Sequence, residues 1–135
     1  MKSAFWSVAM SAAAFCAPAV FAAELSYRAV DAERSWDVPS AWLYSGSLPT
    51  SNDTVKLNDA SIAVPDCLRI TNNVTARAAA LLIGAGASNG DLVAGLKVEQ
   101  GGTLNLAGSG WYNYFTVGDS GRGSLVIDGG TVEPS

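Results

Sequence analysis

The chain has 135 residues, which is enough for one domain at most. Its formal net charge is −4, and its basic residues are scattered along the sequence rather than clustered. A chain without a basic stripe lacks the electrostatic footprint of a nucleic-acid-binding protein, so we expect no nucleic-acid partner. The sequence contains no histidine, and mild acidity is compatible with a soluble extracellular surface.

Residues 1–22 have the layout of a secretory signal peptide. Lys2 is followed by an apolar run over residues 3–14, then by Pro18 and the small-residue end Val20-Phe21-Ala22. The run is too short to span a bilayer, so we expect cleavage after Ala22 and no membrane span in the mature chain. A lipoprotein anchor at Cys16 is disfavoured by the large side chain before it. We therefore expect a secreted or cell-surface protein of the bacterial envelope or extracellular space.

Export leaves the mature chain with one cysteine. Cys16 departs with the signal peptide, and Cys67 alone cannot form an intrachain disulfide. Cys67 follows Asp66 and precedes Leu68, and we interpret it as a buried, unreactive thiol. A catalytic cysteine would need a basic partner, and the chain has no histidine.

Residues 23–52 form a Trp/Pro-rich segment, which we interpret as the cap that leads into the fold. Trp36 and Trp42 lie six positions apart, and a Pro-Thr-Ser-Asn-Asp turn over residues 49–53 follows them. Indole rings bury large apolar areas, and one end of a stack of strands has to be shielded from water. The functional alternative is a pair of sugar-stacking tryptophans.

Residues 53–80 are expected to form a layer of short strands. Apolar residues alternate with polar ones at Val55 and Leu57, at Ile62 and Val64, and again over residues 68–70, with turn residues between the runs. For residues 71–80 the sequence favours a turn and then a strand. A single helical turn through the alanines is the alternative.

Residues 81–135 contain two glycine-rich copies of one pattern and stop within the second. The copies begin with strands ending at Ile83 and Val117, which are 34 residues apart, and each ends in Gly-Gly-Thr, with a spacing of 28 residues from Gly101 to Gly129. Both offsets lie in the range of stacked supersecondary repeats. Short strands and glycine corners at this period predict an all-β chain folded as a β-solenoid. The glycines expected at its corners are Gly84, Gly101, Gly102, Gly118, Gly129 and Gly130.

The second copy, Phe115-Thr-Val-Gly-Asp-Ser-Gly-Arg-Gly-Ser-Leu-Val-Ile-Asp-Gly-Gly-Thr-Val132, resembles the repeat of bacterial autotransporter passengers and PEP-CTERM-associated exported proteins. The copy over residues 81–104 is similar but has a longer loop and the additional Gln100. The resemblance covers about half of the mature chain. It implies a right-handed parallel β-helix used as a stalk, adhesin or matrix component, and it carries over no catalytic residues.

Two glycine-rich segments spell catalytic or cofactor motifs. Gly118-Asp119-Ser120-Gly121 matches the nucleophile segment of trypsin-like proteases, but that chemistry needs a histidine. The loop over residues 84–90 is similar to a dinucleotide-binding loop, but glycines at 95, 101 and 102 interrupt the helix that it requires. We interpret both as solenoid corners and expect no catalytic residues and no cofactor.

Acidic side chains at Asp91, Glu99, Asp119 and Asp128 offer oxygen ligands for calcium. The tandem Gly-Gly-x-Gly-x-Asp pattern of calcium-binding solenoids is absent, so we expect no metal site. A polysaccharide lyase or hydrolase would draw on Asp119, Arg122 and Asp128. Two repeats offer too short a face for a catalytic cleft.

Four aromatic residues interrupt the repeat between residues 111 and 115. Alternation places Trp111 on the face of Phe115, and Tyr112 and Tyr114 on the other face. Trp111, Tyr112 and Tyr114 are therefore candidate contacts for a surface glycan or protein. Aromatic stacking inside the solenoid is the favoured alternative.

These observations predict a non-enzymatic, exported, structural or adhesin-like β-solenoid segment that belongs to a longer protein. The alternative is a carbohydrate-binding or carbohydrate-active β-helix module. An uncapped end exposes apolar surface and free strand edges, so we expect further repeats or another copy to cover the C-terminal end.

Overall fold

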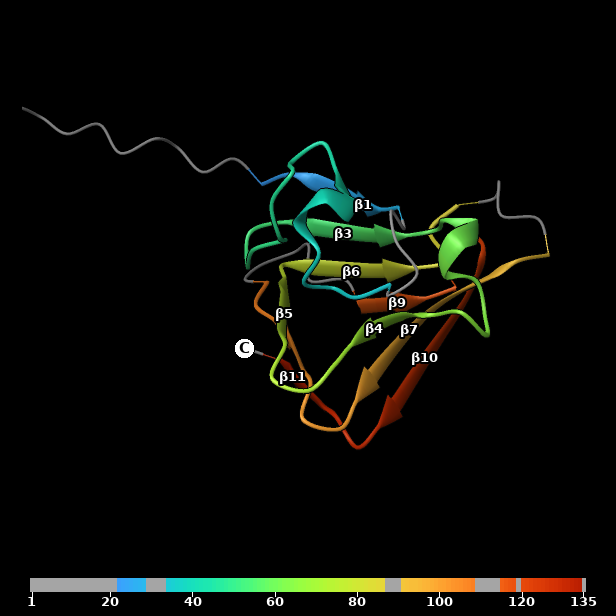
Figure 1. Cartoon of the computed structure of the whole chain (residues 1–135). Coiled ribbons are helices and arrows are strands. Elements are labelled where there is room, and N and C mark those ends of the chain that lie inside the picture. Colours follow the sequence, from blue (N-terminus) through green and yellow to red (C-terminus); the bar gives the residue numbers. More distant parts are fainter. Residues whose placement is uncertain (1–21, 29–33, 87–90, 109–114, 119, 135) are drawn as a thin grey trace, which may run out of the picture.

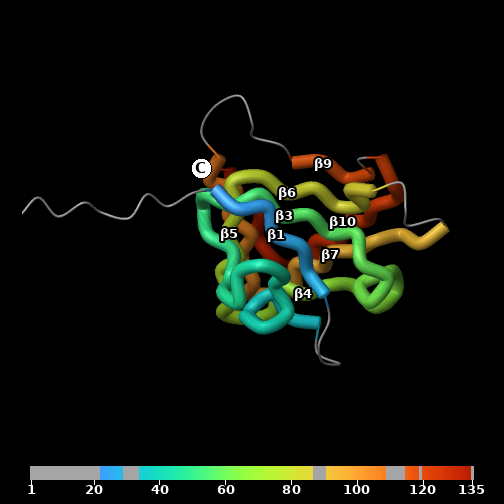
Figure 2. The backbone as a smooth tube through the Cα atoms, turned by 90° about the horizontal axis from the view of Figure 1, so that it is seen from above, coloured from blue at the N-terminus to red at the C-terminus, as the bar shows by residue number. Residues whose placement is uncertain are grey.

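Three sheets, parallel except for the pair of β1 with β2, form the walls of a β-solenoid of about three turns (Figure 1). The structure is a computed structural model, and it describes residues 22–28, 34–86, 91–108, 115–118 and 120–134. Each coil contributes one strand to each sheet, so strands far apart in sequence lie side by side, as Figure 2 shows from above. The prediction of an all-β solenoid is confirmed.

The sheets are named A, B and C in the order in which the chain visits them. Sheet A has the order β2 (Trp42–Leu43), β1 (Glu24–Tyr27), β3 (Thr54–Leu57), β6 (Ala80–Ile83) and β9 (Phe115–Val117). Sheet B contains β4 (Leu68–Ile70), β7 (Val93–Glu99) and β10 (Arg122–Asp128), and sheet C contains β5 (Thr75–Ala78), β8 (Thr103–Leu106) and β11 (Thr131–Pro134). Two short 3-10 helices, η1 (Pro39–Ala41) and η2 (Ala60–Ile62), lie between strands.

The register of the sheets matches the spacing of the sequence repeat. Thr131 lies opposite Thr103 on the neighbouring strand, and Val117 lies opposite Ile83. Leu125 and Ile127 likewise lie opposite Leu96 and Val98. Equivalent residues therefore stack in columns along the solenoid, as the two copies predicted.

The interior consists of the inward-facing residues of each column. In a strand, alternate side chains point to the same face, so one apolar set from each sheet reaches the centre. Leu57, Ile70 and Leu104 are fully buried, and each such side chain contributes about 1.5–3 kcal/mol of hydrophobic stabilisation. The other fully buried apolar residues of the sheets are Val55, Leu68, Ala76, Ala78, Leu81, Ile83, Leu96 and Val98.

Residues 53–80 make a complete first coil, formed by β3, β4 and β5, so the described chain holds three coils where the sequence revealed two repeats. The turn-then-strand interpretation of residues 71–80 is confirmed by β5 and β6. The expected strand at residues 62–64 is wrong. Asp59 accepts a hydrogen bond from the Ser61 N–H over 2.7 Å and starts the 3-10 helix η2, which buries Ile62 without a strand.

Glycines lie at the corners that connect the sheets. Gly84 and Gly118 follow strands of sheet A, and Gly101 and Gly129 precede strands of sheet C, all four with positive φ. Beside them, Gly102 and Gly130 lie so close to the backbone of the preceding coil that a Cβ would overlap it. Glycine adopts the positive φ of the first four positions at little cost, and at the other two positions its missing side chain avoids the overlap.

An aromatic cluster covers the N-terminal end of the stack. Trp36, Trp42 and Tyr27 are each at most 2% exposed, and the Trp36 and Trp42 ring centroids lie 4.7 Å apart. The Trp42 indole N–H donates to the carbonyl oxygen of Trp36 over 2.9 Å. Asp53 attaches this segment to the first coil, since its carboxylate accepts hydrogen bonds from the backbone of Ala23 and from Thr50. The burial favours packed tryptophans over sugar-stacking ones.

Candidate functional site

The aromatic contacts expected at Trp111, Tyr112 and Tyr114 lie outside the described residues. Phe115 is the first described residue after them, and it begins β9 with 43% of its surface exposed. Asp119, which was considered for calcium and for lyase chemistry, also lies outside this part of the chain.

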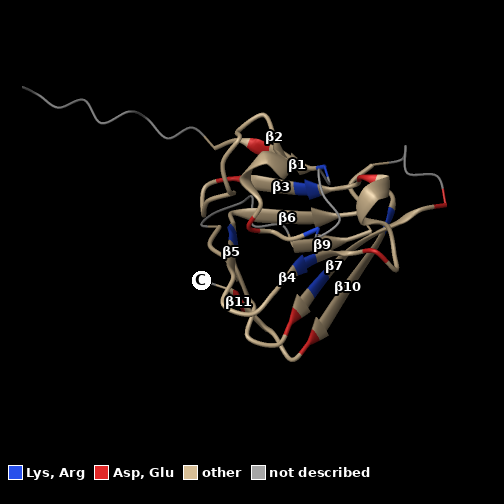
Figure 3. Cartoon of the chain, in the orientation of Figure 1, with Lys and Arg blue, Asp and Glu red and all other residues tan. Residues whose placement is uncertain are grey.

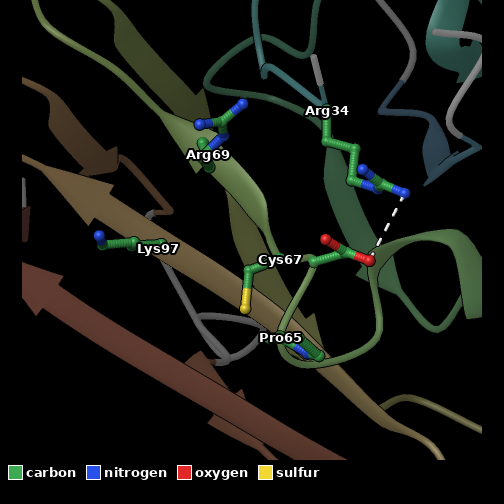
Figure 4. A pocket seen from close by; sticks show the side chains of 6 residues that line it. Arg34, Pro65, Cys67, Arg69 and Lys97 are labelled. Carbon is green, nitrogen blue, oxygen red and sulfur yellow. Dashed lines mark ion pairs between the residues drawn. The ribbon is translucent and has the colours of Figure 1, made fainter. Parts of the chain in front are cut away.

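The structure instead reveals a basic cleft on the outer face of sheet B (Figure 4). Its lining residues come from the N-terminal segment, from the turn before β4, and from β4 and β7: Arg34, Pro65, Asp66, Cys67, Arg69 and Lys97. The cleft has a volume of about 240 Å³. Sites for drug-sized ligands span about 300–1,000 Å³, so this one suits a single sugar-sized group or a small anion.

Strand alternation and register bring the basic side chains together. Leu68 and Ile70 point inward on β4, which directs Cys67 and Arg69 outward. Arg69 lies directly opposite Lys97 on β7, so two cationic side chains are neighbours on one face. Figure 3 shows these basic positions on adjacent strands, with acidic positions at the ends of β7 and β10.

Arg34 joins this face because its backbone extends sheet B. The Arg69 N–H donates to the Arg34 carbonyl over 2.8 Å, and Trp36 N–H donates to the Arg69 carbonyl over 2.9 Å. The Arg34 guanidinium then reaches the Ser61 carbonyl at 2.5 Å and lies 3.8 Å from the Asp66 carboxylate. The aromatic cap and the cleft are therefore built by the same segment.

Acidic residues partly balance the charge of the cleft. Lys97 Nζ lies 2.9 Å from the Asp128 carboxylate and 3.8 Å from that of Glu99. The hydrogen bond and the charge of Asp128 raise the pKa of Lys97, so its ammonium stays protonated at neutral pH. With Asp66 beside Arg34, the three carboxylates equal the three cationic side chains in number, so an anion that enters the cleft has to compete with them.

The Cys67 thiol at the centre of the cleft is poorly suited to nucleophilic chemistry. Cys67 is half-buried rather than buried as expected, and this partial burial is the main cause that raises the pKa of Cys67 above its ordinary value. The thiolate is the reactive form of cysteine, so a raised pKa leaves the thiol protonated at neutral pH. Gly95 lies opposite Cys67, and a Cβ at that position would overlap the sulfur atom.

The remaining candidates do not assemble into a catalytic group. Arg122 and Asp128 lie at opposite ends of β10, where Arg122 faces Asp91 at 3.9 Å and Asp128 pairs with Lys97. Among the described residues, no three cysteine or acidic side chains are grouped so that they could hold a metal ion. Over the same residues, no helix has the length and apolar character needed to cross a membrane.

Comparison with known proteins finds no matching family model, no matching curated protein and no matching solved structure. The cleft itself was missed by sequence reasoning, which treated the basic residues as scattered. Arg69 precedes Lys97 by 28 residues, the spacing of the Gly-Gly-Thr repeat. If the 28-residue spacing had been applied to the coil before the two recognised repeats, it would have predicted that Arg69 and Lys97 are neighbours.

Proposed function

We propose that this chain is an exported, non-enzymatic β-solenoid segment that serves as structural or adhesive material at the bacterial surface. The observation that carries the proposal is a single apolar core that is buried in the first two coils, is partly buried in the third, and is covered by aromatic residues at the N-terminal end. Such a stack forms an extended body that displays its outer faces, because each coil contacts only its neighbours. The signal-peptide layout of residues 1–22 and the resemblance of the second repeat support an exported role.

Fractionation of a bacterial host tests the export step. The full chain with a C-terminal epitope tag is expected in the envelope or medium, with an N-terminus at Ala23. A matched variant with Lys2 and the apolar run deleted is expected to stay in the cytoplasm. Unprocessed full-length chain in the cytoplasm would contradict the proposed function.

A second candidate function is the binding of an acidic carbohydrate in the basic cleft. Three cationic side chains, from Arg34, Arg69 and Lys97, line a cleft of about 240 Å³ on an exposed face. A sugar carboxylate or sulfate suits guanidinium groups, which bind such oxygens through paired hydrogen bonds. This candidate deepens the carbohydrate-binding alternative and assigns it to sheet B.

Titration with oligosaccharides that carry carboxylate groups, and with their neutral counterparts, tests the cleft. Binding of the acidic series alone, weakened about tenfold or more by Arg69→Gln and reduced by added salt, is the expected result. Arg77→Gln is the matched control, because Arg77 is an exposed arginine on β5 of sheet C. Equal loss of binding in both variants would indicate non-specific charge attraction.

A further inference from the structure

A buried carboxylate lies where the N-terminal segment meets the first coil. Asp53, which directly precedes β3, is 7% exposed. Its Oδ2 atom accepts hydrogen bonds from the Thr50 N–H over 2.8 Å and from the Thr50 hydroxyl over 2.7 Å. Its Oδ1 atom accepts from the Ala23 N–H over 3.0 Å, and its backbone carbonyl accepts from the Ala79 N–H over 2.8 Å. Asp53 therefore connects the N-terminal segment, the turn before β3 and the entry to β6.

The donors that reach the Asp53 carboxylate are all electrically neutral. Burial removes the water that would otherwise stabilise a carboxylate, so a buried aspartate is usually accompanied by a cation. Across the described ranges of the chain, no lysine or arginine side chain forms an ion pair with Asp53. The hydrogen bonds satisfy its oxygen atoms, but they do not balance its charge.

The residue that donates to Oδ1 is held in place from its C-terminal side. The Thr54 N–H donates to the Ala23 carbonyl over 2.8 Å, and parallel pairing of β1 with β3 begins at the next residue, where Glu24 lies opposite Thr54. The Ala23 methyl group packs against the core, whereas Ala22 is exposed. These contacts keep the Ala23 nitrogen beside Asp53 without any contribution from the residues that precede it.

We propose that cleavage after Ala22 gives the mature chain an α-ammonium group at Ala23, which forms an ion pair with the buried Asp53 carboxylate. The inference rests on the proposed function, which places signal-peptide cleavage at this bond. A signal peptidase adds water across the Ala22–Ala23 amide, so Ala22 leaves as a carboxylate and the Ala23 nitrogen takes up the released proton. A free α-amino group has a pKa of about 7.7–8.0 and is mostly protonated at neutral pH.

This ion pair adds stability because most of its cost has already been met. The Asp53 carboxylate is buried whether or not the signal peptide is attached. Ala23 is only partly buried, so its ammonium group keeps contact with water on one side. A hydrogen bond between charged groups is about twice as strong as a neutral one. Processing therefore strengthens an existing contact instead of requiring a new arrangement of the chain.

The position of the ion pair links processing to the aromatic cap. The strand β1 starts at Glu24, directly after Ala23, and it pairs with both β3 and β2. Tyr27 on β1 lies opposite Trp42 on β2, and both are buried. Cleavage one residue later would remove Ala23 and take its N–H away from Asp53. The geometry therefore favours Ala23 as the first residue of the mature chain.

Two processed chains that differ by one residue test the ion pair. The full chain is secreted from a bacterial host and purified, next to an extended chain with glycine inserted between Ala22 and Ala23, in which the Ala23 nitrogen stays an amide. N-terminal sequencing verifies both. Asp53→Asn should raise the equilibrium constant for unfolding at least tenfold more in the first chain than in the extended one. Asp59→Asn is the matched control with equal effects expected in both chains, because Asp59 accepts from the nearby Ser61 N–H.

Chemical labelling of the α-amino group decides the case if Asp53→Asn does not fold. Acetylation near neutral pH should be at least tenfold slower in the chain that begins at Ala23 than in the extended chain, since an amine reacts only after it loses its proton. In urea the two rates should become equal.

The outcomes separate this inference from the proposed function. Equal labelling rates in the two folded chains, or equal effects of Asp53→Asn in both, would overturn the ion pair and leave the export proposal standing. An exported chain that begins at Glu24 would do the same. Unprocessed chain in the cytoplasm would contradict the proposed function and the ion pair together.

Discussion

The backbone N–H of Asn73 donates a hydrogen bond to the carbonyl oxygen of Gly101 over 3.1 Å, and both residues have a left-handed backbone, with φ of 65° and 77°. Gly129 continues the same column one coil further on, with φ of 74°. Asparagine is the residue that most readily replaces glycine in this conformation. The first coil is therefore a third copy of the repeat in which Asn73 takes the place of the corner glycine.

The corner at Asn73 predicts a stability difference between two substitutions. Asn73→Val should lower the free energy of unfolding by about 1–2 kcal/mol, since a branched side chain is strained at positive φ. Asn73→Gly should change it by less than about 1 kcal/mol, because glycine adopts the conformation freely. Urea denaturation measures both, and equal losses would show that the side chain, rather than the backbone conformation, matters.

The contact between Gly95 and Cys67 predicts a coupled pair. Gly95→Ala places a methyl group against the Cys67 sulfur and should cost about 1–3 kcal/mol, as overpacking does. Cys67→Ala removes the sulfur, so the double variant should recover most of that loss. A double-mutant cycle by chemical denaturation measures the coupling. Strict additivity of the two changes would contradict the steric explanation.

The aromatic cap predicts a graded response at Trp42. Trp42→Phe keeps most of the ring but removes the indole N–H, which leaves the buried Trp36 carbonyl unsatisfied at a cost of about 1–3 kcal/mol. Trp42→Ala also opens a cavity and should cost about 3–5 kcal/mol. Thermal unfolding, followed by tryptophan fluorescence, checks that Trp42→Ala loses more stability than Trp42→Phe. No difference between the two variants would mean that the cap does not unfold together with the coils.

The raised pKa of Cys67 predicts slow labelling by thiol reagents near neutral pH. The folded protein stays in the thiol form to higher pH than an unperturbed cysteine, so its labelling rate should increase at higher pH than that of the urea-unfolded chain. Measuring the rate with a chromogenic disulfide between pH 7 and 10 gives both profiles. Superimposable profiles would contradict the effect of burial.

Local patterns in the sequence determined the strands that form the three sheets of the solenoid. Alternating apolar residues, the glycine pairs and the 28-residue spacing predicted short strands stacked in register, and Thr103 opposite Thr131 confirms that spacing. These features can be predicted from the sequence because they depend on residues close together in the chain and on a backbone conformation that few residue types adopt. The pattern at Ile62 failed for a local reason, since a capped 3-10 turn buries a residue as a strand would.

The tertiary structure alone decided what the coils bring together. It made residues 53–80 the first coil, placed Arg34 beside Arg69 and Lys97 on sheet B, and gathered the Lys97, Glu99 and Asp128 charges on the same face. None of these follows from local periodicity, because each depends on which strand lies next to which after a full turn of the chain. The repeat predicts which residues stack in columns, whereas the contacts between coils decide which side chains share an outer face.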